Sequence, residues 1–152
     1  MKTYLFYPGC SMDASAQEYK SAMLAVFKAL GAEVREVEDW TCCGASVAPV
    51  MSDLLGLALP ARNLAIAEKM GDSRTMVVGC SACFTSFART NAAVADPATL
   101  ARVNQALEVE NLSYGGTITV RHMLDVLAND FGPAAIAGRV VRPLTGLKVA
   151  PY

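Results

Sequence analysis

The sequence predicts an α/β fold in which helices cover both faces of a parallel β-sheet. Three short apolar segments with strand character alternate with longer segments of helical periodicity, and this alternation is typical of a Rossmann-like parallel sheet. The chain of 152 residues is long enough for one domain with a substantial core. Hydrophobic residues make up 53% of the chain and charged residues 18%, which is the composition of a globular protein.

The first third of the chain predicts a strand, a helix and a second strand. An apolar run over residues 3–7 indicates the first strand, which a Pro-Gly pair ends. A helix is expected over residues 14–30, where apolar side chains recur at helical spacing, and Gly31 supplies its stop. Residues 32–37 alternate between apolar and charged side chains, as a second strand does.

The middle third continues the alternation. Residues 53–70 predict a helix that Pro60 either kinks or divides in two, and Gly71 ends it. Residues 76–79 indicate a short buried strand. A helix is then expected over residues 84–94, so the third strand is followed by its own helix, like the first two.

The last third is less regular. The pattern predicts helices over residues 96–108 and 121–129 and a turn over residues 142–146. Residues 114–120 give no clear indication of a helix or a strand. The apolar residues from 147 to 152 predict the beginning of a further strand.

Composition excludes several classes of protein. No apolar run approaches the ~18 residues that span a bilayer, because Lys20 and Lys28 interrupt the first apolar stretch, and Arg62 and Glu68 interrupt the second. The apolar part of the amino terminus is too short for a signal peptide. A formal net charge of −1 gives no general attraction to nucleic acid or to anionic lipid. The sequence therefore predicts a cytoplasmic protein with no nucleic-acid partner and no membrane span.

Five cysteines have the clearest chemical meaning: Cys10, Cys42, Cys43, Cys80 and Cys83. Their number is odd and no secretion signal precedes them, so metal binding or redox catalysis is favoured over a disulfide framework. All of them lie in loops that follow the three predicted strands. Because the carboxyl ends of parallel strands meet at the same edge of a sheet, we expect these loops to bring the five thiols together.

The chemistry of thiolates limits which metals or clusters these cysteines can bind. Soft thiolates select iron–sulfur clusters, zinc or copper(I). Cys10 and Cys80 are expected to precede helices, whose amino-terminal N–H groups favour anionic thiolates. Five thiolates exceed the four that a structural zinc ion or a cubane cluster takes. Three alternatives remain open: zinc on four of the cysteines, a thioredoxin-like dithiol at Cys80 and Cys83, or cysteines that only fill the core.

Three motifs carry a resemblance to a known family. They are Tyr-Pro-Gly-Cys-Ser-Met at residues 7–12, Asp-Trp-Thr-Cys-Cys-Gly-Ala at residues 39–45 and Gly-Cys-Ser-Ala-Cys at residues 79–83. Together they resemble the cysteine-rich CCG domain, and in particular the amino-terminal half of the heterodisulfide reductase B subunit. The resemblance covers the chain nearly from end to end.

The resemblance implies an iron–sulfur oxidoreductase. In that family, two CCG domains in tandem each use five cysteines to hold a noncubane 4Fe-4S cluster. A small disulfide is reduced in one-electron steps, with electrons from partner subunits that carry flavin and conventional iron–sulfur clusters. Carried over by motif, the same five residues are expected to be the ligands here and, through the cluster, the catalytic groups: Cys10, Cys42, Cys43, Cys80 and Cys83.

The resemblance also predicts the domain organisation. Residues 1–146 are expected to form one CCG domain, and residues 147–152 are expected to begin the first strand of a second CCG domain that this sequence lacks. The function expected is that of one component of a heterodisulfide-reductase-like complex. The alternative is a cluster- or zinc-binding electron-transfer module of a succinate, lactate or glycolate dehydrogenase complex, without a substrate of its own.

Two other residues have ordinary explanations. Trp40 is interpreted as a core residue and not as a shield for a cofactor. His122 lies far from every cysteine in the sequence and is interpreted as a surface or capping residue, not as a ligand.

Overall fold

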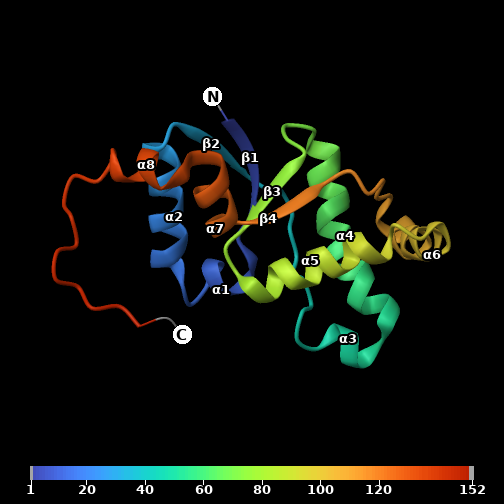
Figure 1. Ribbon diagram of the computed structural model, residues 1–152. Coiled ribbons are helices and arrows are strands. Elements are labelled where there is room, and N and C mark those ends of the chain that lie inside the picture. The colour runs from blue at the N-terminus through green and yellow to red at the C-terminus, as the bar shows by residue number, and fades with distance from the viewer. Residues whose placement is uncertain (1, 151–152) are drawn as a thin grey trace.

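The computed structural model describes residues 2–150 and has the predicted α/β architecture, with a parallel sheet between two layers of helices (Figure 1). The strands are β1 (Lys2–Tyr7), β2 (Ala32–Glu36), β3 (Thr75–Val78) and β4 (Thr119–His122), and their order in the sheet is β2-β1-β3-β4. The helices are α1 (Gly9–Asp13), α2 (Gln17–Ala29), α3 (Ala48–Met51), α4 (Asp53–Met70), α5 (Ser81–Ala93), α6 (Pro97–Leu107), α7 (Met123–Val126) and α8 (Gly132–Ala137). The described residues also form a short 3-10 helix, η1 (Glu108–Glu110), and a short π-helix, η2 (Leu127–Phe131).

The sheet separates two apolar cores. Along β1, Tyr4 and Phe6 point to one face and Leu5 and Tyr7 to the other, because successive side chains of a strand alternate. The first pair packs with side chains of α2 and α7, and the second with side chains of α4, α5 and α6 (Figure 1). Both faces of the sheet are therefore buried, as expected for a parallel sheet.

The first half of the chain follows the sequence prediction closely. The first three strands form where they were expected, and Gly31 and Gly71 end α2 and α4 with positive φ angles of 76° and 74°. The prediction left open whether Pro60 divides its helix, and it does not: α4 is continuous from Asp53 to Met70, with Pro60 buried inside it.

Three local predictions are wrong. A short helix, α1, takes the place of the turn after β1, so Cys10 lies within a helix and not before one. Helix α5 begins at Ser81, earlier than predicted, so Cys83 lies in its first turn. Arg121 and His122 belong to β4 and not to a helix, because they pair with β3.

The carboxyl-terminal segment was expected to begin a strand at residue 147. Residues 147–150 have no regular secondary structure, and residues 151 and 152 lie outside the described residues. No helix in the described part of the chain combines the length and the apolar character needed to cross a membrane.

Candidate functional site

The five cysteines line a single cavity at the carboxyl edge of the sheet. Its volume is about 250 Å³, and its lining includes Cys10, Cys42, Cys43, Cys80 and Cys83. Two of these thiols are buried, one is half-buried and two are exposed, so the cavity opens to the surface on one side. The expectation that the segments after the first three strands bring the five thiols together is therefore confirmed, although Cys10 and Cys83 lie in helices and not in loops. Ligation by these residues stays a prediction.

The sheet register explains why distant cysteines meet. Tyr7 at the end of β1 lies opposite Val78 at the end of β3. The chain therefore leaves these two neighbouring strands at nearly the same level, shortly before Cys10 and Cys80. In an open α/β sheet, ligands bind where the chain leaves adjacent strands for opposite faces, and β1 and β3 are such a pair.

Two glycines allow the close approach of the loops. Gly9 has a φ angle of 69°, and a Cβ atom on it would lie 3.1 Å from Cys83 Sγ. Gly44 follows the vicinal cysteines with a φ angle of 67°, and a Cβ atom there would lie 2.8 Å from the side chains of Ala48 and Leu59. Both positions thus require a residue that accepts a positive φ angle and has no side chain.

The loop that carries the vicinal cysteines is held by the buried side chain of Asn63 in α4. Its Oδ1 accepts a hydrogen bond from the backbone N–H of Thr41 at 2.8 Å, and its Nδ2 donates to the carbonyl oxygen of Thr41 at 3.1 Å. Tyr7 donates to the same carbonyl at 2.7 Å. Asn63 is 0% exposed, so these bonds form away from water and fix the backbone directly before Cys42.

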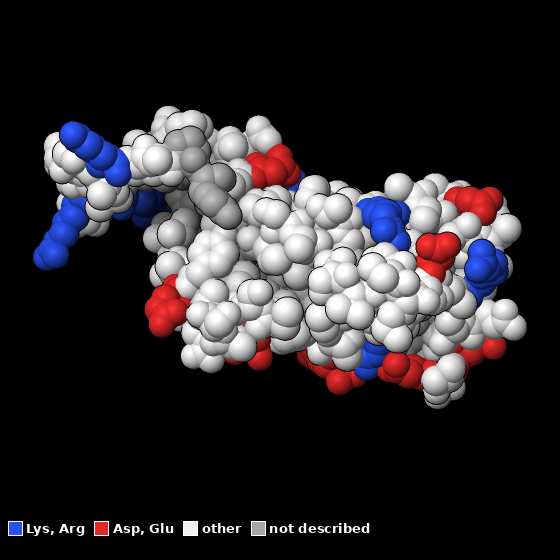
Figure 2. Space-filling model, turned by 90° about the horizontal axis from the view of Figure 1, so that it is seen from below, with Lys and Arg blue, Asp and Glu red and all other residues white. Residues whose placement is uncertain are grey.

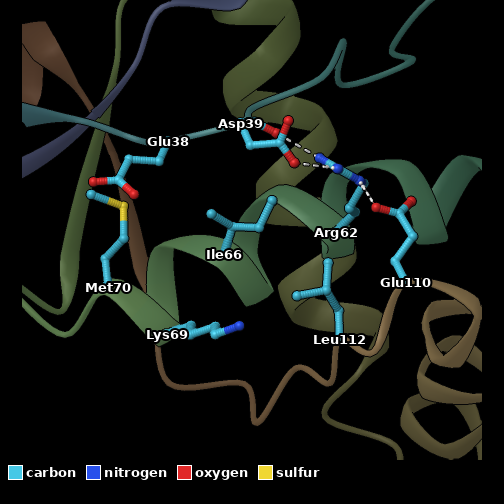
Figure 3. A pocket seen from close by; sticks show the side chains of 8 residues that line it. All are labelled: Glu38, Asp39, Arg62, Ile66, Lys69, Met70, Glu110 and Leu112. Carbon is cyan, nitrogen blue, oxygen red and sulfur yellow. Dashed lines mark hydrogen bonds and ion pairs between the residues drawn. The ribbon is translucent and has the colours of Figure 1, made fainter.

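Arg62, the residue before Asn63 in α4, also holds this loop. Arg62 donates to the carbonyl and the carboxylate of Asp39 and to the carboxylate of Glu110, each at 2.7 Å (Figure 3). Asp39 has a φ angle of 45°, a strained value that this double contact holds in place. The three residues lie at the margin of a cavity of about 460 Å³ that includes none of the cysteines.

Aromatic side chains belong to the same core cluster as the buried thiols of Cys43 and Cys83. Tyr7 is fully buried, and its ring meets those of Trp40 and Phe87 edge to face at centroid distances of 5.5 and 4.7 Å. Trp40 is partly buried and packs against the core, as its interpretation as a core residue predicted. Burial, followed by the charges of the nearby cysteine thiolates, raises the pKa of Tyr7 above its usual range, so its hydroxyl stays a proton donor.

His122 has the capping role that the sequence suggested, together with a contact that it did not suggest. Its Nδ1 accepts a hydrogen bond from the Leu124 N–H at the start of α7, and its Nε2 lies 3.2 Å from the carbonyl oxygen of Gly79. Tyr19 donates to the same carbonyl at 3.3 Å. The peptide group before Cys80 is therefore fixed from two elements that lie far from it in the sequence.

The two buried thiols have unequal acidity. Cys43 Sγ and Cys83 Sγ lie 3.3 Å apart. A hydrogen bond from the Cys83 thiol, with support from the N–H groups of Ala45 and of Cys43 itself, outweighs burial and lowers the pKa of Cys43 to about 6. The same bond, followed by burial, raises the pKa of Cys83 well above the usual range of a thiol. Cys43 is therefore the thiolate of this pair near neutral pH.

The pKa of Cys42 shifts in the opposite direction, although Cys42 is adjacent to Cys43 in the sequence. The N–H of Gly44 lies 3.5 Å from Cys42 Sγ and favours the thiolate. Burial and the neighbouring thiols of Cys10 and Cys43 outweigh that bond and raise the pKa of Cys42.

The cavity between the thiols is large enough for a ligand of several atoms. The described residues contain no group of three or more His, Cys, Asp or Glu side chains placed to hold one metal ion. The thiols instead surround a cavity of about 250 Å³, the volume of about eight water molecules. Soft thiolate donors around such a cavity match the needs of a multi-iron cluster.

Comparisons with known proteins agree with these motifs. A family model described as CCG, cysteine-rich domain, matches residues 4–88. The 8-methylmenaquinol:fumarate reductase membrane anchor subunit of Wolinella succinogenes is 37% identical, with 99% of this chain and 51% of the relative covered. A protein of Archaeoglobus profundus that is named as similar to the heterodisulfide reductase B subunit is 27% identical, with 99% of this chain and 50% of the relative covered. The chain thus spans about half the length of these relatives.

The fold also has a counterpart among solved structures. A hypothetical protein from Helicobacter pylori superposes with a TM-score of 0.71 over 83% of this chain and 25% of that protein, at 16% sequence identity. At this identity the likeness concerns the fold alone.

The Asn63 contacts predict separable effects on stability and on the site. Asn63→Ala leaves the Thr41 N–H without its partner and is expected to lower the free energy of unfolding by about 2–3 kcal/mol. Asn104→Ala is the matched control, because Asn104 makes the same pair of bonds to the backbone of Tyr114, at 2.8 and 3.1 Å. Denaturant titration should give similar losses for both variants, whereas only Asn63→Ala should reduce the iron bound after anaerobic reconstitution. Equal iron binding by the two variants would contradict this role of Asn63.

The unequal acidity of the buried pair predicts a low thiolate titration in cluster-free protein. Ultraviolet thiolate absorbance should show one group with a midpoint near pH 6, and Cys43→Ser should remove it. Cys83→Ala removes the donor to Cys43, so the midpoint should rise toward the ordinary thiol value of about 8.5. Cys10→Ala should leave the midpoint unchanged. A wild-type titration with no step below pH 7 would show that the Cys83 hydrogen bond does not form.

Proposed function

The chain belongs to the CCG cysteine-rich domain family, and on that premise we propose that it binds an iron–sulfur cluster and acts within a heterodisulfide-reductase-like oxidoreductase. The observation that carries the proposal is the set of five free thiols around one cavity, which come from the three segments that follow β1, β2 and β3. Simple core cysteines would not need to meet around a cavity, and a single zinc ion would need the sulfur atoms to converge on one point.

We propose more specifically that the cluster is a noncubane 4Fe-4S cluster held by Cys10, Cys42, Cys43, Cys80 and Cys83. A cubane cluster takes four cysteine ligands, so the presence of five in one cavity favours the noncubane type. Cys43 and Cys83 would form the buried side of the site, and Cys10 and Cys42 the side that is open to solvent. The N–H of Gly44 would donate a hydrogen bond to the sulfur atom of Cys42, and the N–H of Ala45 would donate one to the sulfur atom of Cys43.

The reaction proposed is the reduction of a small disulfide. A disulfide takes up two electrons and two protons and yields two thiols, while its sulfur–sulfur bond breaks. The bound cluster would supply the electrons one at a time. They would come from partner subunits that carry reduced flavin and conventional iron–sulfur clusters. In this complex a second CCG domain, beginning near residue 147, would complete the enzyme, in accord with the double length of the relatives.

The surface around the cavity suits burial against such a domain or partner. The segments that carry the cysteines, residues 3–12, 40–52 and 75–88, contain no charged side chain. Figure 2, viewed from the side of the strand carboxyl ends, shows a broad uncharged area with charged side chains around it. Val47, Val50 and Met51 beside the cysteine loop are 60%, 85% and 71% exposed. Apolar exposure of this kind is typical of protein interfaces.

A second candidate function is electron transfer without a substrate at this site. The observation that favours it is the 37% identity to a component of fumarate reductase, which exceeds the 27% identity to the relative named after heterodisulfide reductase. In that case the domain would be a relay in a succinate, lactate or glycolate dehydrogenase complex, and no disulfide would enter the cavity.

Metal content tests the cluster. Anaerobically reconstituted protein should contain about four iron and four acid-labile sulfide per chain, with an electron paramagnetic resonance signal in the oxidised state. Cys42→Ala and Cys43→Ala should each lose iron while far-ultraviolet circular dichroism stays unchanged. Ser11→Ala is the control, because Ser11 lines the same cavity without a thiol. Unchanged iron in both cysteine variants, or one zinc and no iron, would overturn the proposal.

Electron uptake separates the two candidate functions. Protein reduced under anaerobic conditions should be reoxidised by an added small disulfide, with two thiols released for every two electrons lost. If the cluster is present but is oxidised only by its partner subunits and by no member of a panel of disulfides, the electron-transfer function is correct and disulfide reduction is not.

A further inference from the structure

His122 contacts the segment of Cys80 and Cys83 at both of its ends. Its Nε2 lies 3.2 Å from the carbonyl oxygen of Gly79, directly before Cys80. Its ring meets the ring of Phe84, directly after Cys83, edge to face at a centroid distance of 6.2 Å. His122 itself ends β4, which pairs with β3. The third cysteine segment is therefore held from a neighbouring strand.

The hydrogen bonds of His122 fix which ring nitrogen carries the hydrogen. The N–H of Leu124 can only donate, so Nδ1, which lies 3.3 Å from it, is the acceptor. Nε2 then carries the ring hydrogen. The carbonyl oxygen of Gly79 can only accept, so the Nε2–H group donates to it. The cap on α7 and the bond to Gly79 thus belong to different nitrogen atoms of the ring.

Tyr19 is a second and weaker donor to the Gly79 carbonyl. Its hydroxyl lies 3.3 Å from that oxygen and 2.8 Å from Met123 Sδ. One hydroxyl hydrogen serves both contacts, so His122 is the main donor. Gly79 is also closely packed, since a Cβ atom on it would lie 2.8 Å from Met12 Sδ and 3.3 Å from Cε1 of Tyr19. The peptide group that follows Gly79 is therefore fixed by packing as well as by hydrogen bonds.

The orientation of this peptide group decides what the N–H of Cys80 can reach. In a planar trans peptide the N–H and the C=O point in opposite directions, and the described residues contain no cis peptide bond. Because His122 and Tyr19 hold the Gly79 carbonyl, the N–H of Cys80 points away from both of them. This N–H makes no hydrogen bond with any described residue. Cys80 lines the five-cysteine cavity, so a free donor lies at the wall of that cavity.

The same peptide group leads into the amino terminus of α5. The first N–H groups of a helix have no acceptor within the helix, and the side chain of Cys80 makes no capping hydrogen bond. Ala82 and Cys83, in the first turn of α5, also line the cavity. Hydrogen bonds to the sulfur atoms of a cluster stabilise its reduced state, which carries the greater negative charge. The position of this helix end therefore affects the midpoint potential of a cluster in the cavity.

We propose that His122 is a positioning residue that raises the midpoint potential of the cluster in the five-cysteine cavity, because its bond to the Gly79 carbonyl directs the N–H of Cys80 toward that cluster. This inference rests on the proposed function, because it assumes that a cluster binds there. It applies to both candidate functions, since each requires a redox-active cluster. His122 acts through the peptide group and not as a ligand.

Two amide variants separate the two hydrogen bonds of His122. Gln carries its amide N–H as far along the side chain as Nε2, so His122→Gln keeps the donor to Gly79 and loses the cap on α7. Asn carries its oxygen as far along the side chain as Nδ1, so His122→Asn keeps the cap and loses the donor. Both variants lose the ring and its contact with Phe84, so each is the control for the other.

A redox titration of the cluster-loaded chain, followed by electron paramagnetic resonance, measures the effect. His122→Asn should shift the equilibrium about fivefold toward the oxidised cluster, which lowers the midpoint potential by about 40 mV for one electron. His122→Gln should keep the midpoint potential of the wild type. Urea denaturation of the cluster-free protein should give the opposite order, with His122→Gln less stable than His122→Asn, because only His122→Gln loses the cap.

The same midpoint potential in the wild type and in His122→Asn would overturn the inference, as would an equal decrease in both variants. Tyr19→Phe keeps the test decisive if His122→Asn does not fold or does not hold the cluster, because it removes the second donor to the same carbonyl. It should shift the equilibrium about twofold in the same direction. An unchanged midpoint potential in Tyr19→Phe would then overturn the inference.

The cluster content of the wild type distinguishes this inference from the proposed function. If the wild type holds the cluster and its midpoint potential does not depend on His122, the proposed function stands and the role of His122 does not. If the wild type binds no iron after anaerobic reconstitution, the proposed function is wrong and the inference fails with it.

Discussion

The site depends on the parallel register of β1 and β3. Because Tyr7 and Val78 end the two central strands side by side, the chain leaves both strands at one level, and the first and third cysteine loops start next to each other. A slip of one residue would exchange the faces of Tyr4, Leu5, Phe6 and Tyr7 and move each into the wrong core. The apolar alternation that fills the two cores thus also fixes the geometry of the cavity.

Register alone does not position the second cysteine loop, because β2 ends at Glu36, several residues before Cys42. Helix α4 holds the loop between the end of β2 and Cys42. Asn63 binds the backbone of Thr41 through both its N–H and its carbonyl, as a neighbouring strand would, while Arg62 holds Asp39. A loop without regular structure thereby obtains the backbone hydrogen bonds that a buried segment requires.

The sequence predicts much of this arrangement, and there are physical reasons why it did not predict the remaining elements and contacts. The strands and the loop positions of the cysteines follow from short apolar runs and glycine stops, and topology then brings the loops together. β4 was missed because Arg121 and His122 look helical by periodicity, whereas their pairing with β3 is a tertiary effect. Asn63 and Arg62 were missed because they are ordinary helix residues until the fold brings Thr41 and Asp39 beside them. The predicted start of α5 was about one turn too late, since Ser81 and Ala82 carry no strong helix signal.

The completeness of the two cores has a consequence for how the protein matures. Leu64, Phe87 and Val103 on one side of the sheet, and Met23 and Phe27 on the other, are buried by contacts among side chains alone. In small zinc domains, by contrast, the metal supplies the free energy of folding. Here the polypeptide has the means to fold without a ligand, and the pairing of β3 with β1 brings the first and third cysteine segments together. Delivery of the proposed cluster would then follow folding, and the exposed thiols of Cys10 and Cys42 would be the first ligands that a delivering protein meets.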